Sequence, residues 1–163
     1  METLHAETAD TLARKHFRRV YHFCRTLLSS DADAEDACQT VFLTVSRRRL
    51  EIPGILQPLP WLLQIARLTC LNARRERDRV RAGAMEGDEP AELGPPLAPT
   101  ENLDRVRGLI RNLPERYRSI LALHFQQGLS HEEAAQVLGL SRGALRVLLH
   151  RAVARLRQEA KES

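Results

Sequence analysis

The sequence has few aromatic residues, few cysteines and no long apolar stretch, and each shortage excludes a class of protein. Phe, Trp and Tyr make up 4% of the 163 residues. The three cysteines are widely spaced and odd in number, which is typical of a reduced intracellular protein. No apolar run approaches the ~20 residues of a membrane-spanning helix, and the first ten residues are polar and acidic, unlike a signal peptide. We expect a soluble, cytoplasmic protein without membrane insertion.

Motifs for catalysis, cofactors and metals are also missing. The sequence has no phosphate-binding glycine loop and no Ser/His/Asp arrangement in a motif context. The segment His22-Phe23-Cys24, with His16 nearby, matches no zinc spacing. A packed cysteine and a polar-face histidine explain these residues better than a metal site does. The sequence therefore predicts no enzymatic activity, no cofactor and no metal.

Arginine is abundant, and the charges of opposite sign are segregated along the chain. Among 25 basic residues only Lys15 and Lys161 are lysines, and the net charge is +4. The planar guanidinium group binds phosphate or carboxylate at two points. Residues 82–104 hold six carboxylates, several prolines and glycines and no basic residue, which is typical of an extended linker. We predict an all-α fold with domains at 1–81 and 101–163, joined by a flexible acidic linker at 82–100.

The N-terminal domain is predicted to contain three helices, at about 7–28, 33–48 and 59–81. Apolar residues recur in each with helical spacing. Asp31 or Asp33 is the expected N-cap of the second helix, and Trp61 leads the apolar face of the third. Residues 74–81 contain five arginines. Such a cluster is either a solvated helix end or a surface for a polyanion.

The C-terminal domain is predicted to have four helices, the last three with helix-turn-helix punctuation. The first of the four is capped by Thr100. The later signals are a proline for a first helical turn, glycines for left-handed helix ends, a capping box and a further N-cap: Pro114, Gly128, Ser130 with Glu133, Gly139 and Ser141. In a helix-turn-helix the second helix lies in the DNA major groove.

The last helix carries the chemistry that such a groove requires. Its predicted buried stripe consists of Leu145, Leu149, Ala152 and Leu156. Its polar face is rich in donors and cations that reach base edges and phosphates: Ser141, Arg142, Arg146, His150 and Arg151. The alternative is an ordinary solvated cationic face. Because the turn signals upstream are complete, we favour a DNA-reading module.

Together these segments resemble the extracytoplasmic-function (group 4) sigma factors of bacterial RNA polymerase, which retain only regions 2 and 4. Residues 33–42, DAEDACQTVF, are close to the family's DAEDxxQxxF signature, and residues 61–67, WLLQIAR, are close to WLxxIAR. In region 4 the similar segments are LPERYR at 113–118, GLSHEEAA at 128–135 and HRA at 150–152. The resemblance covers about residues 10–81 and 100–160.

The resemblance implies a role for each segment. The acidic second helix is expected to bind the β′ clamp helices of core RNA polymerase through Glu35, Asp36, Gln39 and Phe42, unless its acidic face is merely solvated. Region 4 is expected at the β flap. The linker is expected in the active-site cleft and RNA exit channel. An anti-sigma factor is a further expected partner.

For promoter DNA, the resemblance assigns the −35 element to the Ser141–Arg157 helix. It assigns recognition and melting of the −10 element to the loop 50–60 and the third helix. The candidate −10 residues are Trp61, Arg67, Arg74 and Arg75, although a core role is the favoured alternative for Trp61. Captured bases are held by stacking and by cations along the backbone.

The sequence departs from the family pattern at Leu68, Asn72, Ala144 and Leu148. The family usually has Asn and an acidic residue at the first two, and Thr and Arg at the last two. Leu148 with Val147 would offer an apolar spot for a thymine methyl or a protein partner. Two alternatives to a sigma factor therefore stay open. One is a free-standing helix-turn-helix regulator, and the other is a degenerate sigma-like protein acting mainly through an anti-sigma partner.

Overall fold

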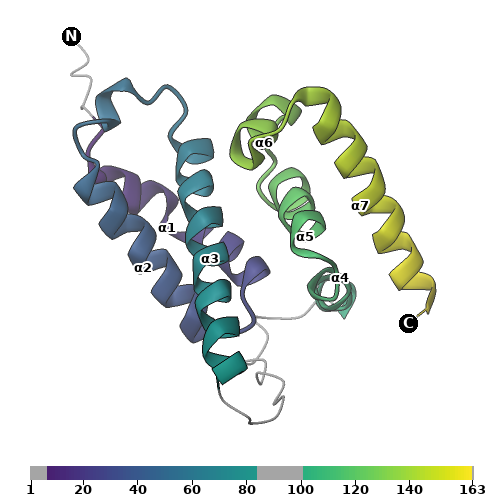
Figure 1. Cartoon of the computed structure of the whole chain (residues 1–163). Helices are drawn as coiled ribbons and strands as arrows, with labels where there is room; N and C mark the ends of the chain where they lie inside the picture. Colours follow the sequence, from purple (N-terminus) through teal and green to yellow (C-terminus); the bar gives the residue numbers. More distant parts are fainter. Residues whose placement is uncertain (1–6, 84–100, 163) are drawn as a thin grey trace.

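The computed structural model describes residues 7–83 and 101–162, and within these ranges the secondary structure is helical, without strands. The N-terminal elements are α1 (Ala9–Leu27), α2 (Asp31–Arg47), a short 3-10 helix η1 (Ile52–Gly54) and α3 (Pro58–Gly83). The C-terminal elements are α4 (Glu101–Arg111), α5 (Glu115–Leu121), a π-helical turn η2 (Ala122–Gln126), α6 (His131–Leu138) and α7 (Arg142–Glu162). The all-α prediction is confirmed (Figure 1). Most of the predicted linker, residues 84–100, lies outside the described residues.

The N-terminus of α2 differs by a few residues from the prediction. Its N-cap is Ser30, whose hydroxyl accepts a hydrogen bond from the Asp33 amide at 3.1 Å. The expected caps, Asp31 and Asp33, instead lie in the first turn, where carboxylates favour the positive end of the helix dipole. Serine is an equally good cap, so the sequence alone did not decide between neighbouring candidates.

The predicted punctuation of the helix-turn-helix is present. Gly128 and Gly139 have φ of 65° and 66° and end the helices before them. The Ser130 hydroxyl accepts from the Glu133 amide at 3.1 Å, and the Ser141 hydroxyl accepts from the Ala144 amide at 3.2 Å. These local contacts fix where α6 and α7 begin.

The N-terminal helices form a three-helix core. Its fully buried side chains include Leu12 and Phe23 from α1, Val41 from α2 and Leu62 from α3. Trp61 is 7% exposed, and the Arg48 guanidinium lies 5.2 Å from its ring centroid. The favoured alternative for Trp61, a core role, is therefore the one that the structure supports.

All three cysteines are buried and none forms a disulfide within the described residues. A hydrogen bond with Cys70 and burial raise the pKa of the Cys24 thiol, and burial raises that of Cys38 to about 12. None of the described helices is both long and apolar enough to cross a membrane.

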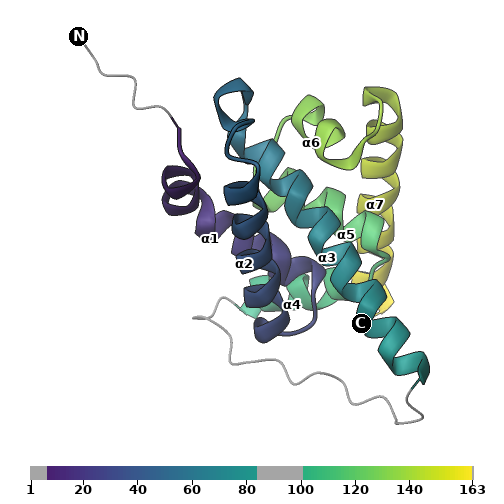
Figure 2. The ribbon, with the colours of Figure 1, turned by 60° about the vertical axis from the view of Figure 1, so that its left-hand side comes forward.

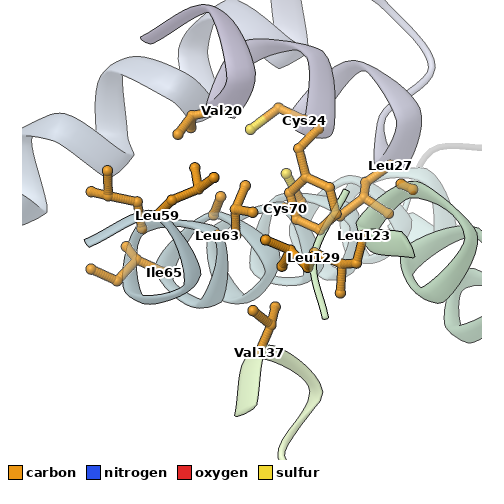
Figure 3. Close-up of a cluster of buried hydrophobic side chains, with 14 of the residues drawn as sticks. Val20, Cys24, Leu27, Leu59, Leu63, Ile65, Cys70, Leu123, Leu129 and Val137 are labelled. Atoms are coloured by element: carbon orange, nitrogen blue, oxygen red, sulfur yellow. The ribbon is translucent and has the colours of Figure 1, made fainter. Parts of the chain in front are cut away.

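Helix α3 also packs against the C-terminal domain, so the apolar core continues across both domains. Figure 1 shows α3 between α2 on one side and α5 and α6 on the other, and the turned view in Figure 2 agrees. In the close-up of Figure 3, Leu63 of α3 lies in one cluster with Leu123, Leu129 and Val137. In this arrangement the two domains form one packed body.

We predict that Gly139→Ala lowers the free energy of unfolding by about 1–2 kcal/mol, the cost of placing an L-residue in the left-handed region. Nothing lies within 4 Å of the added Cβ, so sterics against neighbours do not contribute. Urea unfolding measures the change. The matched control is Gly108→Ala inside α4, where the same methyl also meets nothing. It should stabilise the protein by about 0.5–1 kcal/mol. Equal changes in the free energy of unfolding for the two variants would contradict the left-handed backbone conformation of Gly139 at the end of α6.

Candidate nucleic-acid and protein interfaces

The polar face of α7 is presented to solvent as the sequence predicted. The exposed residues include all the candidates for base and phosphate contact: Ser141, Arg142, Arg146, His150 and Arg151. The opposite side of the helix packs on α5 and α6, with Leu145 and Ala152 completely buried. The cations are therefore carried by a helix whose position is fixed by packing.

The buried stripe of α7 contains one residue that the sequence placed on the wrong face. Leu148 is 8% exposed, whereas the predicted Leu149 is only half-buried. Leu148 lines a hollow of 490 Å³ between the start of α5 and α7, together with Tyr117. The prediction that Leu148 presents an apolar spot to DNA is therefore wrong. Val147 is 50% exposed and is the apolar side chain available on this side.

The polar strip of α2 is exposed at Glu35, Asp36 and Gln39. Phe42 is half-buried, and its ring lies 5.9 Å from that of Phe17 on α1. Phe17 is 48% exposed and stacks in turn on Tyr21, with ring centroids 6.4 Å apart. The strip is thus bordered by an aromatic cluster, which we define as Phe17, Tyr21 and Phe42. The α1 members were not among the residues predicted for this surface, although the spacing of Phe17 and Tyr21 indicates a shared helix face.

A groove of 970 Å³ runs between α2 and α3. The α2 wall includes Asp36 and Thr40, and the α3 wall includes Leu68, Asn72 and Arg74. Leu68 is 52% exposed. Two of the departures from the family pattern therefore line a single surface next to a candidate polymerase-binding carboxylate. An ion pair of 2.5 Å between Arg77 and Asp33 ties the two walls together.

The candidate −10 residues of α3 do not share one surface. Arg75 is exposed and Arg74 is half-buried on the groove wall. The side chain of Arg67 is only 18% exposed and faces the C-terminal domain, with its Nε 3.4 Å from Glu115 Oε1 of α5. Trp61 lies in the core beneath Arg48. The partner of Arg67 was not predicted, because it comes from the other domain.

Two family models match the chain, in the order that the motifs suggested. Residues 12–80 match the model described as Sigma-70 region 2, and residues 103–156 match the model described as Sigma-70, region 4. Together the matches include α1–α3 except for a few end residues, and most of α4–α7.

Full-length relatives and solved structures agree with these matches. The chain is 30% identical to RNA polymerase sigma factor CarQ of Myxococcus xanthus over 91% of this chain and 87% of the relative. It is 32% identical to ECF RNA polymerase sigma factor SigE of Mycolicibacterium smegmatis, again over 91% of this chain, but it spans only 60% of that relative. The fold is similar to sigma factor RpoE from Bartonella quintana in its complex with the anti-sigma factor NepR, with a TM-score of 0.81 at 22% identity over 93% and 96% of the two chains.

We predict that Arg146→Ala weakens binding of the full chain to duplex DNA and reduces the slope of log affinity against log salt by about 0.9, the effect of losing one phosphate contact. Fluorescence anisotropy with mixed-sequence duplex DNA at several salt concentrations measures this slope. Arg14→Ala on α1 removes the same charge from a side chain that is 84% exposed, and it should leave the slope unchanged. An equal loss in both variants would show that overall charge, rather than α7, determines binding.

Proposed function

The chain belongs to the sigma-70 family of RNA polymerase sigma factors, in its extracytoplasmic-function group, and from that membership we propose how its surfaces share the steps of transcription initiation. It is an alternative sigma factor, which binds core RNA polymerase and directs promoter-specific initiation. The observation that carries this function is the presence of both regions, in order, in one chain. The nucleotide chemistry then belongs to the polymerase.

The docking surface for polymerase is the strip of Glu35, Asp36 and Gln39 on α2, together with the aromatic cluster beside it. The carboxylates attract a basic partner surface and set its orientation. The aromatic rings supply the apolar contact area that hot spots require. This assignment is supported by the exposure of the strip and by the stacked rings of Phe17 and Phe42 beside it. The expected target is the β′ clamp helices, and region 4 is assigned to the β flap.

The −10 element is assigned to α3 and the groove between α2 and α3. Arg74 and Arg75 are assigned to the backbone of an opened strand, and the support is that Arg75 is exposed and Arg74 lines the groove. Arg67 is expected to join them when its partner from α5 is displaced. Trp61 supports this surface from within the core and is no longer a candidate for base stacking. Leu68 and Asn72 line the groove, so they are the positions where we expect base preference to differ from the family's usual one.

The −35 element is assigned to α7. Arg142, Arg146 and His150 follow one another at one-turn spacing on its exposed face, which allows contacts with successive base pairs and flanking phosphates. Ser141 and Arg151 flank this row. Helix α7 begins at a capped turn after α6. In a helix-turn-helix the N-terminal residues of the second helix contact base edges, so we assign this contact to the start of α7.

An anti-sigma factor is proposed as a regulatory partner. Structural neighbours are sigma factors bound to such proteins, NepR in one case and the cytosolic domain of CnrY in another, with TM-scores of 0.81 and 0.68. The Sigma-70 region 2 match of residues 12–80 counts against a free-standing regulator. A degenerate sigma-like protein that acts mainly through an anti-sigma factor is distinguished from an active sigma factor by its failure to start transcription.

Run-off transcription with core bacterial RNA polymerase and pooled promoter DNA tests the proposed function. We expect new transcripts with defined starts only when this protein is added, and the mapped starts would give its −35 and −10 sequences. A stable complex with polymerase that starts no transcript would favour the degenerate alternative. Failure to bind polymerase at all would overturn the sigma assignment.

We predict that Glu35→Lys with Asp36→Lys reduces binding to core polymerase at least tenfold while duplex DNA binding by α7 persists, because the change puts cations on a surface expected to meet a basic partner. Surface plasmon resonance against immobilised polymerase measures the affinity. The matched control is Asp10→Lys with Glu162→Lys, which changes the net charge equally at exposed positions on α1 and α7. If polymerase affinity is the same for both double variants, α2 is not the docking helix.

A further inference from the structure

Helices α3 and α5 carry charged side chains that meet between the two domains. Arg67 and Arg74 are seven residues apart on α3, or about two turns, so they lie on one face of that helix. Glu115 and Arg118 are about one turn apart on α5. Figures 1 and 2 show α5 beside α3, and the ion pair between Arg67 and Glu115 joins the two helices. Charged residues that are distant in the sequence are therefore neighbours here.

Arg118 is buried without a partner for its guanidinium Nε. The residue is 8% exposed, and the Nε has no hydrogen-bond partner among the described residues. The charged groups that act on it are Arg74, which repels it, and Glu115, which attracts it. Burial and Arg74 lower the pKa of the Arg118 guanidinium, and Glu115 offsets this only in part. A buried cation in this state is costly.

The carboxylate at this contact already has another partner. Glu115 Oε1 accepts a hydrogen bond of 2.6 Å from the Ser119 hydroxyl and lies 3.4 Å from Arg67 Nε. That Nε is buried and, like the one of Arg118, has no hydrogen-bond partner in the described part of the chain. We define Arg67, Arg74, Arg118 and Glu115 as the interdomain arginine cluster. Its guanidinium groups outnumber its carboxylate by three to one, which leaves a net charge of +2.

Another arginine at the domain contact is fully paired within the chain. Arg19 of α1 donates hydrogen bonds to the side-chain oxygen of Gln127, at 3.1 Å, and to its main-chain oxygen. The amide nitrogen of Gln127 donates back to the Arg19 carbonyl at 3.0 Å. The described residues thus supply acceptors for Arg19 but none for the Nε of Arg67 or Arg118. The missing acceptors are a property of the cluster and not of the domain contact as a whole.

An anion satisfies the cluster better than water does. A water molecule accepts a hydrogen bond from a guanidinium group, but it leaves the repulsion between Arg74 and Arg118 in place. A phosphate group carries about −1.5 to −2 charges near pH 7 and has several oxygen acceptors, which complements the net charge of the cluster. Arginine binds such oxygens through two parallel N–H donors. Arg74 also lines the groove between α2 and α3, so the cluster borders a surface that solvent reaches.

We propose that the interdomain arginine cluster is a binding site for a small phosphate-bearing anion, held between α3 and α5 by Arg74 and Arg118 with Arg67 beside them. A free phosphate ion and the phosphate group of a nucleotide present the same oxygens to this site. The inference uses the packing of the free chain and does not depend on which residues contact the promoter or the polymerase.

Thermal unfolding and isothermal titration calorimetry of the full chain, without polymerase or DNA, test the site. Inorganic phosphate is the probe, and sodium chloride at equal ionic strength corrects for screening. We expect phosphate to raise the Tm of the parent chain, because a ligand that binds only the folded state stabilises it. A nucleoside 5′-monophosphate is titrated in the same way. Tighter binding than that of inorganic phosphate assigns the site to a nucleotide, and weaker binding assigns it to the free ion.

Two substitutions should shift the phosphate affinity in opposite directions. Arg118→Met removes the buried cation, and we expect at least a tenfold loss of affinity. Glu115→Gln removes the competing carboxylate, and we expect about a tenfold gain. The matched controls are Arg116→Met on α5 and Glu132→Gln on α6, which remove the same charges from exposed positions. Both controls should bind phosphate like the parent chain.

The Arg118→Met variant also separates a ligand site from a structural role. In chloride buffer it should have a Tm no lower than that of the parent, because it removes a buried cation that lacks acceptors. It should lose only the gain in Tm that phosphate gives.

A parent chain with no phosphate-dependent rise in Tm and no titration heat overturns the proposal. An equal response to phosphate in the parent, Arg118→Met and Arg116→Met also overturns it, since the effect is then not located at the cluster. Circular dichroism checks that each variant keeps its helices. If Arg118→Met does not fold, Glu115→Gln decides, and an unchanged phosphate affinity in that variant counts against the site.

Discussion

The double packing of α3 is the constraint on which the rest of the structure depends. One side of this helix closes the N-terminal core, where Leu62 and Ala66 are completely buried. Another side receives the C-terminal domain, and Leu63 belongs to the cluster that includes Leu129 and Val137. A helix that carries two interfaces has little surface left for a third partner. The availability of its arginines is therefore decided by domain arrangement rather than by their position in the sequence.

The charges of the N-terminal domain divide into those that hold the fold and those left for partners. Asp33 is half-exposed and joins α2 to α3 through its 2.5 Å ion pair with Arg77. Glu35 and Asp36, two and three residues further on, are exposed on the helix surface. A segment that looks uniformly acidic in sequence thus has one carboxylate that joins two helices and others that are exposed and proposed to bind polymerase. The same division applies to the arginine cluster, in which Arg77 is paired with Asp33 and Arg75 is exposed at the surface.

Features fixed by neighbouring residues could be predicted from the sequence, and features fixed by distant ones could not. The glycine helix end at Gly139 and the serine cap at Ser130 depend on a few adjacent atoms, and both were predicted correctly. The face occupied by Leu148 depends on the angle at which α7 meets α5, and periodicity placed it wrongly. The contact between Arg67 and Glu115 joins two domains across a linker, and no local pattern indicates it. The roles assigned to individual residues at the promoter and at the polymerase remain proposals.

Helix α7 keeps its folding residues and the residues proposed to face DNA on separate sides. Leu145 and Ala152 are buried, whereas Arg142, Arg146 and His150 lie on the exposed side. Substitutions on the exposed side should therefore change which promoters are chosen with little loss of stability. Duplicated copies of such a gene would then be free to diverge toward new sets of target genes without first acquiring compensating mutations in the core. The geometry of a single helix in this way makes the regulatory specificity of the protein open to evolution while its fold is retained.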